Sequence, residues 1–89
     1  MSNSPSSTVT LNGALALLAE CFNLPVGEVH ADLERDAIAD WDSMGALMLM
    51  AELDERFGIE LTADASREMN RIADVLIFLR GHGVLRDEA

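Results

Sequence analysis

Lysine is absent from this chain, and its six basic residues, all arginine, stand against 16 acidic residues. The formal net charge is therefore −10 at pH 7. A surface this negative repels phosphate backbones and anionic lipid headgroups, because both are bound by cationic side chains. We therefore expect no binding to nucleic acid or to membranes. We expect instead partners that present patches of arginine and lysine.

Cysteine is almost absent as well, because Cys21 is the only one. An internal disulfide and a zinc site built from several cysteines are therefore excluded. Cys21 lies in an apolar stretch with helical spacing, which predicts a small buried side chain without chemistry of its own. The longest apolar run, residues 44–51, is too short to span a bilayer, and residues 1–7 lack the basic side chains of a signal peptide. The expected location is the cytoplasm.

A chain of 89 residues has room for one domain. We expect a serine-rich, disordered leader over residues 1–7, a folded domain over residues 8–81 and a C-terminal tail over residues 82–89. Apolar spacing predicts three main helices, over residues 8–23, 43–57 and 72–80, and one short helix within residues 63–70. Their predicted inner faces hold Leu11, Leu15, Leu18 and Phe22 in the first helix and Ile72, Val75, Leu76 and Leu79 in the last.

The acidic stretch 24–42 has apolar residues without helical period, so it is predicted to be a long loop between the first two main helices. Its scattered apolar side chains are expected to hold it against the domain, and they are Val26, Val29, Leu33, Ile38 and Trp41. No segment alternates in the way that would demand a strand. The sequence therefore predicts an all-α fold.

Residues 43–57 form the best-defined predicted helix, and Gly58 is placed to end it in a left-handed conformation. At roughly 100° per residue the helix has two apolar faces. The face predicted to join the core holds Ala46, Leu49, Met50, Leu53 and Phe57. The opposite face, confined to the first two turns, holds Met44, Leu47, Met48 and Ala51, flanked by Asp54 and Glu55. A domain this small cannot bury both, so we expect an exposed methionine-rich patch, which is typical of binding sites. The alternative is that residues 24–42 cover it with Ile38 or Trp41.

Ser43 follows Asp42 at the start of this helix, where free backbone N–H groups and the helix dipole favour an anion. A phosphodiester on the serine hydroxyl would be stabilised there. The same Asp-Ser pair is also typical of an ordinary helix N-cap. A helical adaptor in which Ser43 is only a cap is therefore the alternative of a different class.

The segment Asp42-Ser43-Met44, followed fourteen residues after Ser43 by Phe57-Gly58-Ile59-Glu60-Leu61, resembles the phosphopantetheine attachment region of acyl carrier proteins and their peptidyl and D-alanyl relatives. The resemblance continues without a gap over residues 8–81, through Val29, Leu33 and Trp41 upstream and Ile72, Val75, Leu76 and Leu79 downstream. It implies a monomeric four-helix bundle of the acyl carrier type. It also implies that Ser43 receives 4'-phosphopantetheine from coenzyme A, and that Asp42 helps the phosphopantetheinyl transferase and its metal ion to engage.

The resemblance implies a carrier and not an enzyme, because the chemistry on the thioester cargo is done by other proteins. His30 and His82 likewise lie in no nucleophile or metal pattern. The implied partners are the transferase and the acyl-loading and acyl-processing enzymes with basic docking patches. Met44, Leu47 and Met48 are the candidate apolar centre of docking. Glu52, Asp54 and Glu55 are the candidate contacts for basic patches, with a merely solvated helix face as the alternative for each acid.

The sequence departs from the pattern of fatty-acid-type carriers, and these differences narrow the kind of carrier that we expect. The positions two and five after the serine, usually acidic in fatty-acid-type carriers, are Gly45 and Met48 here. Ser43-Met44-Gly45 is similar to D-alanyl carriers, whereas the segment after Phe57 fits the acyl carriers better. We therefore expect an acyl carrier of a specialised pathway, of the secondary-metabolite or modified-fatty-acid type. An aminoacyl, peptidyl or D-alanyl carrier is the alternative, and the cargo stays open.

Calcium binding is a further hypothesis, because acidic residues alternate from Asp32 onward. An EF-hand loop that starts there needs glycine at its sixth position and glutamate at its twelfth. The chain has Ala37 and Ser43 at these positions. The sequence therefore argues against a specific calcium site.

Overall fold

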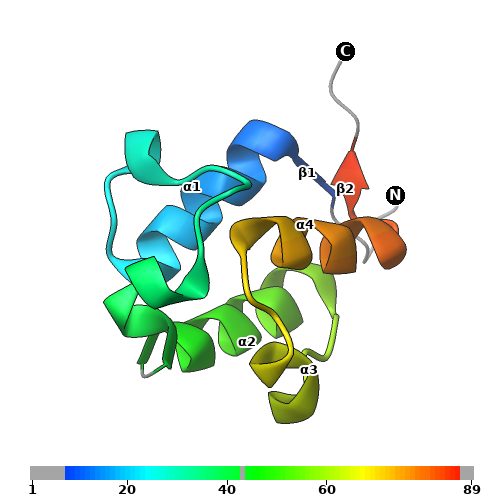
Figure 1. Ribbon diagram of the computed structural model, residues 1–89. Coiled ribbons are helices and arrows are strands. Elements are labelled where there is room, and N and C mark those ends of the chain that lie inside the picture. Colours follow the sequence, from blue (N-terminus) through cyan, green and yellow to red (C-terminus); the bar gives the residue numbers. More distant parts are fainter. Residues whose placement is uncertain (1–7, 43, 87–89) are drawn as a thin grey trace.

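The computed structural model describes residues 8–42 and 44–86, except for the side chains of Asp40 and Asp42. The elements in chain order are β1 (Val9–Thr10), α1 (Leu11–Phe22), the 3-10 helices η1 (Val26–Glu28), η2 (Arg35–Ala37) and η3 (Ala39–Asp42), then α2 (Met44–Phe57), α3 (Ala63–Arg67), α4 (Ile72–Gly81) and β2 (Leu85–Arg86). The fold is small, compact and mostly helical, consistent with a helical bundle (Figure 1). The acyl carrier type of bundle stays a prediction. The expected leader, residues 1–7, lies outside the described residues.

The helix ends follow from local sequence. The Thr10 hydroxyl accepts a hydrogen bond from the Gly13 N–H at 3.1 Å and caps α1. Gly58 ends α2 with a φ of 67°, the left-handed conformation predicted for it. The Asp74 carboxylate accepts from the backbone N–H of Arg71 at 3.2 Å at the start of α4. No helix of the described residues combines the length and the apolar character that a bilayer crossing requires.

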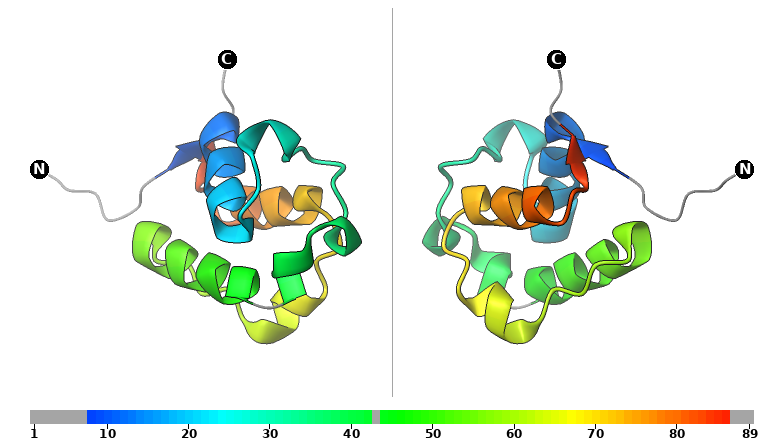
Figure 2. Two further views of the ribbon diagram at one scale, coloured as in Figure 1. Left: turned by 90° about the vertical axis from the view of Figure 1, so that its left-hand side faces the viewer. Right: turned by 90° about the vertical axis from the view of Figure 1, so that its right-hand side faces the viewer.

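The expectation that the fold has no strand is wrong. β1 and β2 pair in parallel, with Val9 opposite Leu85, and the Val9 N–H donates to the Val84 carbonyl at 2.8 Å. Both views in Figure 2 place the pair beside α1 and α4. Two-residue strands are too short to show alternation, which is why periodicity missed them. Val84 and Leu85 are buried, so residues expected in a tail contribute to the core.

The buried face of α1 differs from the predicted one. Leu18 and Phe22 are buried as expected, but Leu11 is exposed and Leu15 only half-buried. Ala14, Leu17, Ala19 and Cys21 are buried in their place. The cause is that α1 contacts both strands, η1, η3 and α2, so that its buried arc is broad and rotated. In α4 the predicted inner residues Ile72, Val75 and Leu79 are fully buried, and Leu76 is half-buried.

Residues 24–42 cross the bundle as three short 3-10 helices joined by extended links. The backbone N–H of Arg35 donates to the carbonyl of Asn70 at 2.7 Å, and the N–H of Ile72 donates to the carbonyl of Leu33 at 3.0 Å. These bonds hold the segment along the start of α4. Of the apolar side chains expected to anchor it, Val29, Ile38 and Trp41 are buried and Leu33 is half-buried. Val26 is exposed, so its predicted anchoring role is wrong.

Candidate functional site

Ser43, the predicted attachment residue, lies outside the described residues. The chain reaches it from η3, which ends at Asp42, and leaves it into α2, which begins at Met44. The roles expected for Ser43 and Asp42 are therefore untested and stay predictions. The structure describes the backbone on both sides of this junction and the side chains from Met44 onward.

The second apolar face of α2 is exposed, as the sequence predicts. Met44 is 69 % exposed, Leu47 62 % and Met48 43 %, and Ala51 is exposed as well. We call Met44, Leu47 and Met48 the methionine patch. The alternative in which residues 24–42 cover this face is wrong, because the two side chains proposed to do so, Ile38 and Trp41, are buried in the core.

The opposite face of α2 joins the core only in part. Leu49, Leu53 and Phe57 are buried, as predicted. Ala46 and Met50 are half-buried, because they line a pocket between α2 and α3 rather than the centre of the bundle. The start of α2 thus presents side chains both to solvent and to a cavity.

The three acidic residues predicted to contact partners differ in their surroundings. Asp54 and Glu55 are exposed on the last turns of α2. The Glu52 carboxylate is less exposed and pairs with the Arg56 guanidinium one turn later, at 2.5 Å. An ion pair of this kind on a helix surface adds little stability but partly neutralises the carboxylate. A docking role for all three acids stays a prediction, and Asp54 and Glu55 present the less compensated charge.

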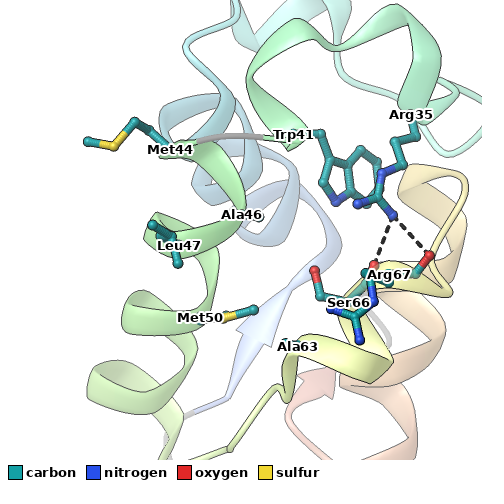
Figure 3. A pocket seen from close by; sticks show the side chains of 9 residues that line it. All are labelled: Arg35, Trp41, Met44, Ala46, Leu47, Met50, Ala63, Ser66 and Arg67. Carbon is teal, nitrogen blue, oxygen red and sulfur yellow. Dashed lines mark hydrogen bonds between the residues drawn. The ribbon is translucent and has the colours of Figure 1, made fainter.

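The pocket has a volume of about 600 Å³ and lies between the first turns of α2 and the short helix α3. Figure 3 shows its lining side chains, which are Arg35, Trp41, Met44, Ala46, Leu47, Met50, Ala63, Ser66 and Arg67. Its walls are mostly apolar, with a few polar groups from η2, η3 and α3, as is usual for small-molecule sites. Sequence reasoning missed this pocket, because it depends on where α3 packs, and the apolar spacing of α3 does not specify that position.

Arg35 holds one side of the pocket together. Its Nη1 donates to the backbone carbonyl oxygens of Ser66 at 3.0 Å and Met69 at 2.7 Å. Its guanidinium carbon lies 5.4 Å from the centre of the Trp41 ring, within the range of a cation–π contact. A cation is favourable at the C-terminal carbonyls of a helix, so Arg35 fixes the end of α3 to η2. The sequence signal was that Arg35 is the single basic residue of the acidic stretch 24–42.

Trp41 forms the inner wall of the pocket. Its side chain is 0 % exposed, and its ring stacks on Phe22 with centroids 4.9 Å apart. Among the described residues, its indole Nε1 has no hydrogen-bond partner. Figure 3 shows this nitrogen on the ring edge that faces the space between α2 and α3. A buried N–H donor without an acceptor is rare in folded proteins and needs an explanation.

Outside the pocket, Cys21 is buried, as predicted. Burial, and then the negative charges of Glu52 and Glu20, raise the pKa of its thiol to about 11. His30 and His82 are exposed, and the ring centroids of His82 and Phe78 lie 4.6 Å apart. No cluster of three or more potential metal ligands occurs within residues 8–42 and 44–86.

Three comparisons with known proteins give no match: no family model, no curated protein and no solved structure is similar to this chain at a significant level. Function must therefore be inferred from the residues and their arrangement.

Proposed function

We propose that this chain is an acyl carrier protein that bears 4'-phosphopantetheine on Ser43 and moves a thioester-bound substrate between enzymes. The observation that carries the proposal is the exposure of Met44 and Leu47 directly after the Asp42-Ser43 pair, on a chain with a net charge of −10. Exposed apolar side chains in a contiguous group indicate a binding surface. Their position beside a potential attachment residue is what a carrier requires.

The chemistry expected at the junction of η3 and α2 is simple. The Ser43 hydroxyl would lose its proton and bond to the phosphorus that carries the pantetheine arm of coenzyme A. The pyrophosphate bond of coenzyme A would break and adenosine 3',5'-bisphosphate would leave, so that the phosphate becomes a diester on the Ser43 oxygen. The unpaired backbone N–H groups and the dipole at the start of an α-helix stabilise the remaining negative charge. The arm ends in a thiol, which holds the cargo as a thioester. In this proposal the chain makes and breaks no bond of the cargo, and other enzymes act on it in turn.

Docking would combine two features of α2. The methionine patch supplies an apolar centre whose flexible side chains adapt to several partners. The exposed carboxylates of Asp54 and Glu55 attract basic patches and accelerate encounter in a salt-dependent way. A small apolar centre with steering charges favours fast and reversible binding. A carrier that serves several enzymes in turn needs such binding. We propose that this carrier belongs to a specialised pathway.

Incubation with coenzyme A and a broad-specificity phosphopantetheinyl transferase tests the proposal. The intact mass should rise by one phosphopantetheinyl group, and Ser43→Ala should abolish the rise. Thr62→Ala is the matched control, because the Thr62 hydroxyl caps α3 by accepting from the Ala65 N–H at 3.1 Å. It removes a helix-capping hydroxyl elsewhere, so the mass rise should persist while stability falls by about 1 kcal/mol.

The same experiment distinguishes the carrier from the helical adaptor in which Ser43 is only a cap. If Ser43 is only a cap, the wild-type mass stays unchanged, and Ser43→Ala costs no more than Thr62→Ala. Modification at any residue other than Ser43, located by peptide mapping, would equally contradict the proposal. The Ser43→Ala variant must remain folded for the comparison to count, and circular dichroism reports this directly.

A further inference from the structure

The unpartnered indole nitrogen of Trp41 sets the chemistry of the pocket. The N–H is a donor only, and among the described residues it is buried without an acceptor, so that it lacks there the hydrogen bond that it makes in water. The ring is fixed by stacking on Phe22 and by the guanidinium of Arg35. The nitrogen is therefore held in one direction, toward the space between α2 and α3 (Figure 3).

The rest of the pocket suits an aliphatic chain. Ala46, Leu47 and Met50 line it from α2, and Ala63 lines it from α3. Ligand sites commonly combine apolar walls with a few fixed polar groups, and the polar groups then select the ligand. Arg35, Ser66 and Arg67 also bring polar groups to this pocket, and the Trp41 N–H at the inner wall is the buried donor without a partner among the described residues.

The position of the pocket in the sequence indicates its occupant. Trp41 and Met44 both line it, and Ser43 lies between them in the chain. An arm attached to Ser43 therefore starts between two pocket-lining residues. The group that such an arm brings to the pocket is its own cargo.

We propose that the pocket takes acyl groups that carry an oxygen on the chain, such as 3-hydroxyacyl or 3-oxoacyl groups, whose oxygen accepts a hydrogen bond from Trp41 Nε1. This inference rests on the proposed carrier function. A saturated chain gains the apolar contacts but leaves the nitrogen without an acceptor. The nitrogen has no exposed surface, so a side chain of the wall turns aside on binding. Met50, unbranched and half-buried, is the side chain best able to do so.

Nuclear magnetic resonance of the nitrogen-15-labelled chain tests this, because one tryptophan gives one indole resonance. The transferase loads three arms from the coenzyme A thioesters of butanoate, 3-hydroxybutanoate and 3-oxobutanoate, and the intact mass confirms each loading. The indole proton should move downfield and exchange more slowly with water in the two oxygen-bearing forms than in the butanoyl form.

Cleavage of the thioester by hydroxylamine gives a second measurement. Each rate on the carrier is divided by the rate for the same coenzyme A thioester, which removes differences in intrinsic reactivity. The oxygen-bearing forms should be protected about three- to tenfold more than the butanoyl form, the range for one added hydrogen bond. Trp41→Phe keeps an aromatic ring without the donor and should abolish this difference.

Each other outcome overturns the inference in a recognisable way. An equal indole shift in all three forms assigns the acceptor to the thioester or the arm and removes the selectivity for oxygen-bearing cargo. An unchanged indole resonance in all three forms removes the pocket as a cargo site, although the carrier function stands. Failure of all loading refutes the proposed function itself, and the inference with it. The measurement on wild-type protein decides even if Trp41→Phe fails to fold.

Discussion

Raising the pH from 8 to 11 should destabilise this protein through a single side chain, Cys21. Burial, followed by the charges of Glu52 and Glu20, raises the pKa of its thiol from an ordinary value of 9.0 to about 11 in the folded state. The chain contains no lysine and no tyrosine, so no other side chain has an ordinary pKa within this interval. The titration of Cys21 is therefore not overlapped by that of lysine or tyrosine side chains, as it is in most proteins.

The sign and size follow from proton binding. Below pH 9 the thiol keeps its proton in both states, and the stabilisation is fully present. Between pH 9 and pH 11 the unfolded chain releases the proton while the folded chain retains it, so stability falls as the pH rises. The loss is about 1 kcal/mol at pH 10 and about 2 kcal/mol at pH 11. Each kcal/mol corresponds to roughly 4–8 °C in Tm for a domain of this size.

Urea unfolding followed by far-ultraviolet circular dichroism, at fixed ionic strength in reducing buffer, measures this loss. Cys21→Ala is the control: it lowers stability at every pH, but its free energy of unfolding should not vary between pH 8 and pH 11. Two results would refute the reasoning. One is a wild-type protein whose stability is constant over this interval, and the other is a Cys21→Ala variant that loses as much as the wild type.

The remaining predictions concern packing and capping, and urea unfolding measures all of them. Arg35→Ala should cost about 2–3 kcal/mol, because Nη1 donates to several backbone carbonyls at the end of α3. Arg67→Ala is the control, because it also removes one arginine but breaks only the exposed ion pair with Asp64, and its free energy of unfolding should stay within about 0.5 kcal/mol of wild type. Equal losses in the two variants would contradict the role given to Arg35. Leu49→Ala, at a fully buried position, should cost about 2–5 kcal/mol, whereas Leu47→Ala should cost less than about 0.5 kcal/mol. A large loss in Leu47→Ala would mean that the methionine patch is buried in solution. Thr10→Ala should cost about 1 kcal/mol through the lost cap of α1, and no change would remove that assignment.

Helical periodicity predicted most of the buried residues of α2 and α4. In α2 it separated the buried Leu49 and Leu53 from the exposed Met44 and Leu47, and in α4 it identified the inner face. Gly58 was recognised as a helix end, because its left-handed conformation disfavours most other residues. These features are written in the sequence over short distances, where spacing and residue type suffice.

The features that the sequence did not reveal depend on contacts between distant segments. The β1–β2 pair joins residues near the two ends of the chain through backbone groups, which every residue carries. The bonds from Arg35 likewise end on carbonyl oxygens of α3 and leave no mark in side-chain composition. The pocket and the unpartnered nitrogen of Trp41 require the position of α3, which is too short to be placed by its own pattern. In α1, which has neighbours on several sides, only Leu18 and Phe22 of the four residues predicted for the inner face are fully buried.

The parallel pairing of β1 with β2 also governs how this domain can be combined with others. Because Val9 lies opposite Leu85, the backbone enters and leaves the bundle at neighbouring points. A domain of this geometry can be inserted into a surface loop of a host protein without forcing the ends of that loop apart. The proximity of these two points also permits circular permutation. A short bridge would join residues 8 and 86, and new termini would be opened in an exposed turn such as the one at Gly58.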